Sequence, residues 1–165
     1  MNRKFGNIVV RDAHERDTLS VIRVHFDSVH YVASKDYPIE ILDEWSPPVS
    51  EERIKKFLIN GADVKLVAEL NGDIVGFGEL LTKKNQLGAV YVSSSAIGQG
   101  IGRTIVMCLE EIAKQKGVPF LQMESSVTAS PFYQKIGYQV LAHGVHVLDS
   151  GQTMSCVKMR KDFLV

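Results

Sequence analysis

The chain has 165 residues, the length of one ordinary domain, and carries 19 Lys or Arg and 19 Asp or Glu residues. This balance argues against a basic nucleic-acid-binding surface, and the two distant cysteines argue against a disulfide scaffold. No segment has the composition of a signal peptide or a membrane span. The sequence therefore predicts one cytoplasmic domain over residues 1–165, with neither nucleic acid nor a membrane as partner.

The first third of the chain is expected to form one strand and three helices. NIVVR (7–11) has the composition of a short strand, and Pro38 and Ser50 are typical of helix starts. From Asp17 onward, apolar residues recur at steps of three and four, which indicates one face of a helix. These residues are Leu19, Ile22, Phe26 and Val29.

The rest of the chain is expected to be richer in strands. Asn71-Gly72-Asp73 is typical of a hairpin turn between two apolar segments. The expected order is strands 64–70, 74–81 and 87–92, helix 100–116, strand 119–124, helix 129–135, and strands 138–148 and 152–160. This order favours an α+β (mixed α/β) fold with a central, mostly antiparallel twisted sheet of about six to seven strands and about four helices.

A glycine-rich loop, AIGQGIGRT (96–104), precedes the helix at residue 100. Glycine allows left-handed backbone and leaves the amides open beside the positive end of a helix dipole, which suits a phosphate. The loop fits neither standard nucleotide motif. A P-loop would need glycine at Ile97 and lysine at Arg103, and GxGxxG would need its third glycine at Arg103. The loop therefore predicts an anion site of another kind.

Two segments resemble signatures of the GCN5-related N-acetyltransferase (GNAT) superfamily. VYVSSSAIGQGIGRTIV (90–106) is similar to its acyl-CoA loop, and SVTASPFYQKIGY (126–138) is similar to its Asn-x-x-Ala-x-x-Phe-Tyr segment. With the order of elements, the resemblance covers essentially the whole chain. Residues 28–48 further resemble the small bacterial acetyltransferases called YafP-like. Ile97 departs from the family's arginine or glutamine, and Ser126 departs from its asparagine.

The resemblance implies an acetyl-CoA-dependent N-acetyltransferase without a metal, acting on an amine of a small molecule or peptide. It also implies a possible homodimer through the final strands. No activated cysteine or Ser-His pair is visible, so direct attack by the amine is expected. A non-catalytic acyl-CoA-binding sensor is the alternative, and phosphoryl transfer is disfavoured because the P-loop lysine is missing.

The resemblance also implies catalytic roles for particular residues. Tyr133 would donate a proton to the departing thiolate, since a phenol stays protonated at neutral pH. A main-chain N–H of Tyr91 or Val92 would polarise the acetyl carbonyl. Glu79 and Glu124 are candidates for the base, because burial in an apolar strand raises a carboxyl pKa. A packing role for Tyr133, solvated carboxylates and a water chain as base remain alternatives.

Two sets of binding residues complete the expectation. The first is implied for acetyl-CoA: Tyr91, Val92, Ile97, Gly98, Gln99, Gly100, Ile101, Gly102, Arg103, Thr104, Ser126 and Tyr133. The second lies in the helical segment that roofs the acceptor cleft in this family: His25, Asp27, His30, Tyr31, Tyr37 and Trp45. For the polar members of both sets, ordinary solvated or capping roles stay open.

Overall fold

The computed structural model describes residues 1–164, which contain eight strands and five α-helices. The strands form one sheet in the order β1-β2-β3-β4-β5-β6-β8-β7, in which only β5 and β6 are parallel. The strands are β1 (Asn2–Phe5), β2 (Ile8–Asp12), β3 (Val64–Leu70), β4 (Asp73–Leu81), β5 (Gln86–Val92), β6 (Phe120–Ser126), β7 (Gln139–Val147) and β8 (Thr153–Asp162). The helices are α1 (Thr18–Tyr31), α2 (Ile39–Trp45), α3 (Glu51–Leu58), α4 (Ile101–Gln115) and α5 (Ser130–Lys135). This arrangement confirms the predicted α+β fold.

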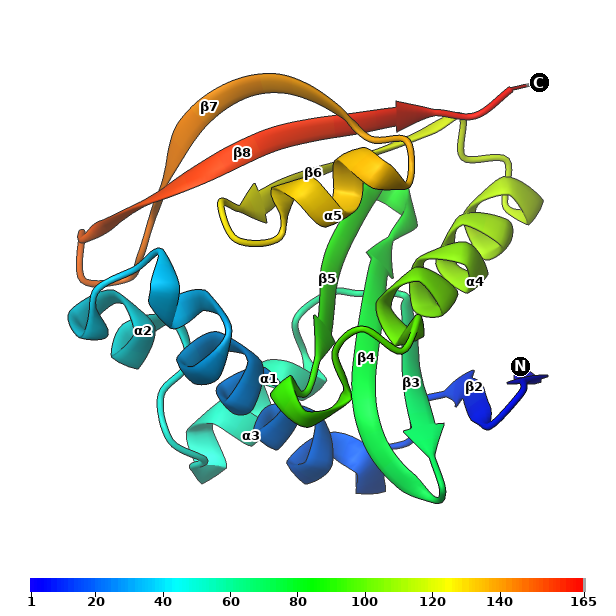
Figure 1. The fold of residues 1–165 in the computed structure, drawn as a ribbon, viewed down its shortest axis with the longest axis horizontal. Helices are drawn as coiled ribbons and strands as arrows, with labels where there is room; N and C mark the ends of the chain where they lie inside the picture. Colours follow the sequence, from blue (N-terminus) through cyan, green and yellow to red (C-terminus); the bar gives the residue numbers. More distant parts are fainter. Residues whose placement is uncertain (165) are drawn as a thin grey trace.

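The sheet opens between β5 and β6. These two strands share a single register pair, Gln86 with Gln122, whereas β4 and β5 pair along most of their length. Figure 1 shows the antiparallel strands β3 to β5 upright in the view and β6 to β8 crossing them at the top. The sheet therefore splits into two halves that diverge from one end of β5.

Helix α4 packs closely on β4 because two glycines leave room for it. A Cβ atom added to Gly78 would lie 2.6 Å from Ile105 Cγ2 and 2.7 Å from Leu109 Cδ1. A Cβ atom on Gly76 would lie 2.9 Å from Ile105 Cδ1. Residues two apart on a strand face the same side, so the two glycines together leave the space in which α4 packs against β4.

Helices α1 to α3 lie on the opposite face of β4 and β5. Val21 and Val24 of α1 pack with Val67 and Phe77 in one buried cluster. Ser50 caps α3, as predicted, by accepting a hydrogen bond of 3.1 Å from the Arg53 amide. Within residues 1–164, no helix combines the length and apolar character that crossing a membrane requires.

The hairpin of β7 and β8 closes over α2 (Figure 1). Its turn is fastened to Glu44, whose carboxylate accepts hydrogen bonds from the Ser150 amide at 2.7 Å and the Ser150 hydroxyl at 2.8 Å. Gln152 Nε2 donates to the same carboxylate at 3.0 Å. The helical roof is thereby attached to the far half of the divided sheet.

Two sequence predictions are wrong in detail. The segment NIVVR is a strand, but β1 precedes it and pairs with it through a turn at Gly6, which has φ of +61°. That strand was missed because it is short and mostly polar. Leu19 was expected on the buried face of α1 and is instead exposed, since the sheet contacts α1 along Val21 and Val24.

Candidate active site

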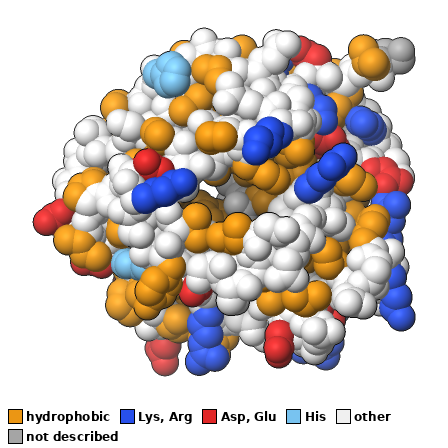
Figure 2. Space-filling model, viewed as in Figure 1, with side chains coloured by type: hydrophobic (Ala, Val, Ile, Leu, Met, Phe, Trp, Pro, Cys, Tyr) orange, Lys and Arg blue, Asp and Glu red, His pale blue; other side chains and the backbone are white. Residues whose placement is uncertain are grey.

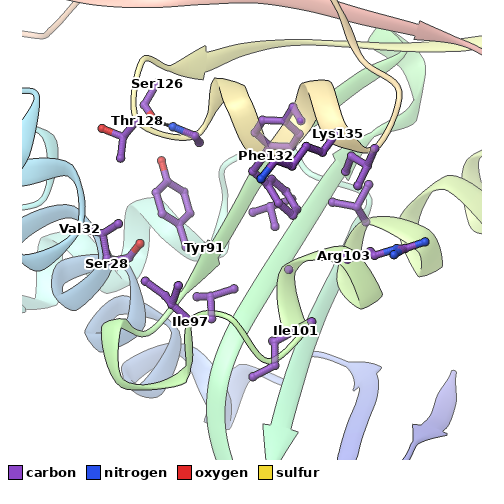
Figure 3. A pocket seen from close by; sticks show the side chains of 18 of the residues that line it. Ser28, Val32, Tyr91, Ile97, Ile101, Arg103, Ser126, Thr128, Phe132 and Lys135 are labelled. Carbon is purple, nitrogen blue, oxygen red and sulfur yellow. Dashed lines mark hydrogen bonds between the residues drawn. The ribbon is translucent and has the colours of Figure 1, made fainter.

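A cavity of about 1020 Å³ occupies the opening between the two halves of the sheet. Figure 2 shows the hollow at the centre of the face, with Lys and Arg side chains around it. In Figure 3, Ser28 of α1 and Val32, which follows α1, lie on one side, Arg103 of α4 lies on the other, and Tyr91 of β5 lies between them. The cavity is thus built from segments far apart in sequence.

The glycine loop forms one wall of this cavity. Gly98 and Gly100 both have φ of +80°, a conformation that side chains disfavour, and a Cβ atom on either would meet nothing within 4 Å. Gly102, the second residue of α4, lies against Phe132, whose ring atom Cζ would lie 3.3 Å from an added Cβ. The loop therefore needs glycine for its backbone and leaves the first amides of α4 open to a ligand.

The charges around the cavity are mainly positive. Its basic lining residues are Lys35, Arg103, Lys135 and Lys161, and its single carboxylate among residues 1–164 is Glu110. Lys161 Nζ donates to both Glu110 oxygens, at 2.9 and 3.0 Å, which neutralises that carboxylate. The cavity thus favours a ligand with several negative charges. Across residues 1–164, no three His, Cys, Asp or Glu side chains gather to hold a metal ion.

Tyr133 of α5 lines the cavity from a buried position. Only 5% of its surface is exposed, and its ring packs against Phe132 and Tyr138. Burial, and to a smaller extent nearby Tyr91, raises the pKa of Tyr133 well above its usual range. Its phenol therefore remains a proton donor over the whole neutral and moderately alkaline range.

The register of β4 and β5 decides which main-chain amides face the opening. The Ser93 amide donates to the Val75 carbonyl at 2.8 Å, and Val92 is opposite Gly76. Because amides alternate in direction along a strand, the Val92 N–H points away from β4 toward the splay. The Tyr91 amide points toward β4, so of the two predicted amides Val92 is the one that faces the cavity.

Four of the twelve residues implied for acetyl-CoA need separate comment. Ser126 lines the cavity, and its hydroxyl also accepts a hydrogen bond of 3.1 Å from the Ala129 amide in the turn that precedes α5. Ile97 lines the cavity with an exposed side chain. Gln99 and Thr104 do not line it, and the Thr104 hydroxyl donates instead to the Gly100 carbonyl at 2.8 Å.

The predicted acceptor residues divide into cavity-lining and structural groups. Trp45 lines the cavity, whereas Tyr31 is 70% exposed and does not. The Tyr37 hydroxyl donates to the Ser155 carbonyl at 2.6 Å and accepts from the Val127 amide at 2.8 Å. Tyr37 therefore joins the helical roof to the edge of the opening.

The remaining acceptor candidates also make structural contacts. Asp27 accepts a hydrogen bond of 2.5 Å from the Ser94 amide, before the glycine loop. His30 Nε2 donates to the Ser46 carbonyl at 2.8 Å and its ring stacks on Phe26. His25 lines a second, smaller cavity together with Glu79.

Neither predicted base lines the larger cavity. Glu79 faces the smaller one, on the side of α1 and α3. Glu124 has a half-exposed side chain whose Oε2 is 3.1 Å from His146 Nδ1. Burial raises the pKa of Glu79, partly offset by Lys65 and by a hydrogen bond from Asn60.

Sequence reasoning missed three basic residues of the site, Lys35, Lys135 and Lys161. Lys135 lies two residues after Tyr133 in the same motif, so its position in that short helix was a usable signal. Lys35 and Lys161 come from a turn after α1 and from β8, and only the folded topology brings them to the cavity.

Comparison with known proteins now decides the family. The sequence profile of the acetyltransferase (GNAT) domain matches residues 33–163, more than half of the chain. The chain belongs to the GNAT acetyltransferase family. The fold agrees with a GCN5-related N-acetyltransferase structure from Rhodopseudomonas palustris, with a TM-score of 0.86 and 23% identity over 98% of this chain and 99% of that one.

Other similar proteins either agree less well in fold or match only a short part of the chain. The PaiA N-acetyltransferase of Thermoplasma acidophilum, solved with coenzyme A, has a TM-score of 0.74 and 23% identity over 94% of this chain and 99% of that one. The glucosamine 6-phosphate N-acetyltransferase of Trypanosoma brucei brucei is 38% identical over 50 residues, covering 30% of this chain and 34% of that protein. The uncharacterized protein YyaT of Bacillus subtilis is 46% identical over 41 residues, 25% of this chain and 28% of that protein. The matches to curated relatives thus span about a third of those proteins or less.

Proposed function

We propose that this GNAT domain transfers the acetyl group of acetyl-CoA to a primary amine of a small molecule or peptide. The observation that carries the proposal is the larger cavity, where the glycine loop, a ring of basic residues and the Tyr133 phenol meet. Such a site suits an elongated ligand with phosphates at one end and a thioester at the other.

The residues of the cavity fit this donor. The open amides at Gly98, Gly100 and the start of α4 would bind the pyrophosphate, and Arg103 would add charge beside them. Lys135 provides further positive charge along the same cavity, and Lys161 cancels the charge of Glu110. When bound, acetyl-CoA supplies an activated acetyl thioester, and the chain has to position it and exclude water.

Two groups of the chain would act on the reacting atoms. The Val92 N–H, which points away from β4, would hydrogen-bond the acetyl carbonyl oxygen as negative charge develops on it. Tyr133 would protonate the departing thiolate sulfur. The amine attacks directly, and water in the cavity takes its proton. The assignment of Glu79 or Glu124 as the base stays a prediction.

The acceptor is left at the level of a primary amine. Near the acceptor end, Ser28, Thr128 and Trp45 line the cavity together with apolar residues of α1. The similarity of part of the chain to a glucosamine 6-phosphate N-acetyltransferase supports a small polar amine as the acceptor. The YafP-like assignment and the cytoplasmic location stay predictions.

We also propose that the protein forms a homodimer through β7. This strand pairs only with β8 among residues 1–164, and Leu141, Val145 and Val147 are exposed along it. An unpaired edge with apolar side chains favours pairing with a second copy. Light scattering would report a dimer for the wild type and a monomer for Val145→Lys. A monomeric wild type at micromolar concentration would contradict the dimer.

Calorimetric titration with acetyl-CoA tests the proposed function, with ATP and NAD as controls. Selective binding of acetyl-CoA is expected, followed by release of free thiol when a panel of amines is added. Binding without thiol release from any amine would favour the sensor. Absence of binding would remove the assignment of the cavity to acetyl-CoA.

A further inference from the structure

A second cavity, of about 310 Å³, lies on the other face of β5. It is an open cavity lined by residues of α1, α3, β4 and β5, and the aromatic rings of Phe57 and Phe77 form part of its lining. Trp45 and Tyr91 line both cavities, so these two rings form the partition between them. Apart from Glu79, which stays a predicted base, the acetyl transfer proposed above, with water as the proton acceptor, uses no residue found only in this second cavity.

One end of the cavity holds a carboxylate that is incompletely satisfied. Glu79 is 5% exposed, and its Oε2 accepts a hydrogen bond of 2.9 Å from Asn60 Nδ2. Its other oxygen, Oε1, is buried and has no hydrogen-bond partner within residues 1–164. A buried acceptor without a donor costs free energy, so this oxygen calls for a donor from a ligand.

Another part of the lining holds a guanidinium that forms no ion pair among residues 1–164. Arg53 donates to the Pro47 carbonyl, to Ser46 Oγ at 2.8 Å and to His25 Nδ1 at 2.9 Å. All three acceptors are neutral, since burial and the Arg53 charge lower the pKa of His25 to about 3. The positive charge of Arg53 is therefore uncompensated, and burial lowers its pKa.

His25 adds a donor beside Arg53. Because Arg53 can only donate, His25 Nδ1 is the acceptor in their hydrogen bond and the proton of the neutral ring lies on Nε2. That N–H has no hydrogen-bond partner among the residues described. Arg53 and His25 together offer what a carboxylate requires.

The other charged groups nearby are already engaged. Lys56 also lines the cavity, and its Nζ is 3.3 Å from Glu52 Oε1. Lys65 does not line the cavity, but its charge lowers the pKa of Glu79. Its Nζ donates to the Phe57 carbonyl at 2.7 Å and lies 4.6 Å from the Phe57 ring centroid. Among residues 1–164, the two charged groups of the lining left for a ligand are the Arg53 guanidinium and the Glu79 carboxylate, with the His25 N–H beside Arg53.

We infer that this second cavity binds a zwitterion, with its carboxylate against Arg53 and His25 and its ammonium group against Glu79. A simple amine would leave Arg53 uncompensated and a simple acid would leave Glu79 Oε1 without a donor. A ligand carrying both groups satisfies both residues, while its aliphatic part contacts Phe57 and Phe77. The class of ligand is a free amino acid or another amine-bearing carboxylic acid.

Trp45 provides the signal for binding, because it is the single tryptophan of the chain and lines this cavity as well as the larger one; the substitutions below assign the signal to this cavity. Its fluorescence would be titrated, without acetyl-CoA, with ω-amino acids of two to six carbons and with the n-alkylamine and n-alkanoate of each length. At the best length the wild type should bind the amino acid at least 10-fold more tightly than either single-charge analogue.

Substitutions identify the two contacts. Glu79→Gln should reduce the affinity for the amino acid to that of the alkanoate, and Arg53→Gln should reduce it to that of the alkylamine. The conservative variant Arg53→Lys should keep the preference, which separates loss of charge from misfolding. Glu51→Gln, at an exposed position of α3 outside the cavity lining, should bind as the wild type does.

Equal affinity for the three ligand types, or no binding of any, would overturn the inference. So would unchanged affinity in both Glu79→Gln and Arg53→Gln. Affinity for acetyl-CoA is measured separately on the same proteins, so a failure of the proposed acetyl transfer leaves this result unaffected. Binding at the second cavity and binding at the glycine loop are thus judged independently.

Discussion

Tyr133 and Tyr138 pack edge to face with 5.6 Å between their ring centroids, yet only Tyr133 lines the larger cavity. If Tyr133 protonates the departing thiolate, Tyr133→Phe should lower kcat by roughly 10²-fold, a typical value for loss of a general acid. Its affinity for acetyl-CoA should stay unchanged, because the ring is retained. Steady-state thiol release and calorimetry measure the two quantities.

Tyr138→Phe is the matched control for this experiment. The Tyr138 hydroxyl is buried without a hydrogen-bond partner within residues 1–164, and Tyr138 does not line the larger cavity. Its loss should leave kcat within about twofold, since it removes no contact to the reacting atoms. Equal kcat losses in the two variants would assign Tyr133 a packing role.

Gly100→Ala should weaken acetyl-CoA binding by an order of magnitude or more. An alanine at φ of +80° costs about 1 to 2 kcal/mol of strain, and relief of that strain would turn the loop amides away from the ligand. Gly151→Ala is the control, because Gly151 has φ of +91° in the distant β7–β8 turn. Both variants should lose similar thermal stability, and only the first should lose affinity in the calorimeter.

Gly78→Ala should destabilise the protein by about 1 to 3 kcal/mol, the usual cost of overpacking a core. Its added Cβ would lie 2.7 Å from Leu109 Cδ1, and α4 would have to move away from β4. Gly144→Ala is matched, because its Cβ would meet Lys158 Cε at an ordinary 3.6 Å. Urea denaturation compares them, and equal free energies of unfolding would refute the close packing of α4.

The free energy of unfolding should fall in acid, because protonation of Asp17 removes its ion pair with Arg11. Arg11 donates to both Asp17 oxygens, at 2.7 and 3.0 Å, and lowers the pKa of Asp17 from 3.8 to about 2. A carboxyl with a lowered pKa contributes stability above its unfolded pKa and loses it as pH falls through the folded value. This contribution, about 2 kcal/mol, should therefore disappear between about pH 4 and pH 2.

Asp17→Asn checks this directly by denaturation at several pH values. The variant should be less stable than the wild type at pH 7, by about the same 2 kcal/mol. Near pH 2 the two proteins should have nearly equal stability, because Asp17 is then about half protonated in the folded chain and almost fully protonated in the unfolded chain. A difference that is constant from pH 7 to pH 2 would show that the charge of Asp17 does not matter.

The sequence made the glycine loop predictable because its signals are local. Gly98 and Gly100 need a backbone that other residues disfavour, and Ser50 needs only the Arg53 amide three residues later. The hairpin at Asn71 and Gly72 is equally local, and both residues have positive φ. Each of these features is determined by residues that lie within a few positions of one another in the sequence.

The rest of the site depends on contacts across the chain. Tyr37 is bound by the Ser155 carbonyl, which lies 118 residues later, so no local pattern could separate its structural role from substrate contact. Lys161 reaches the cavity only after β8 pairs with β6. The same holds for the choice between Val92 and Tyr91, which depends on the register of β5 against β4.

The single register pair between β5 and β6 also predicts how the molecule opens. With little backbone pairing across Gln86 and Gln122, the segment from β6 to β8 should behave as a cooperative unit separate from β2 to β5. A ligand in the larger cavity contacts both units at once, through Val92 and Ser126. Amide exchange of β6 and β8 should therefore slow on acetyl-CoA binding. The bound acetyl-CoA would link β5 to β6 where the two strands lack backbone hydrogen bonds.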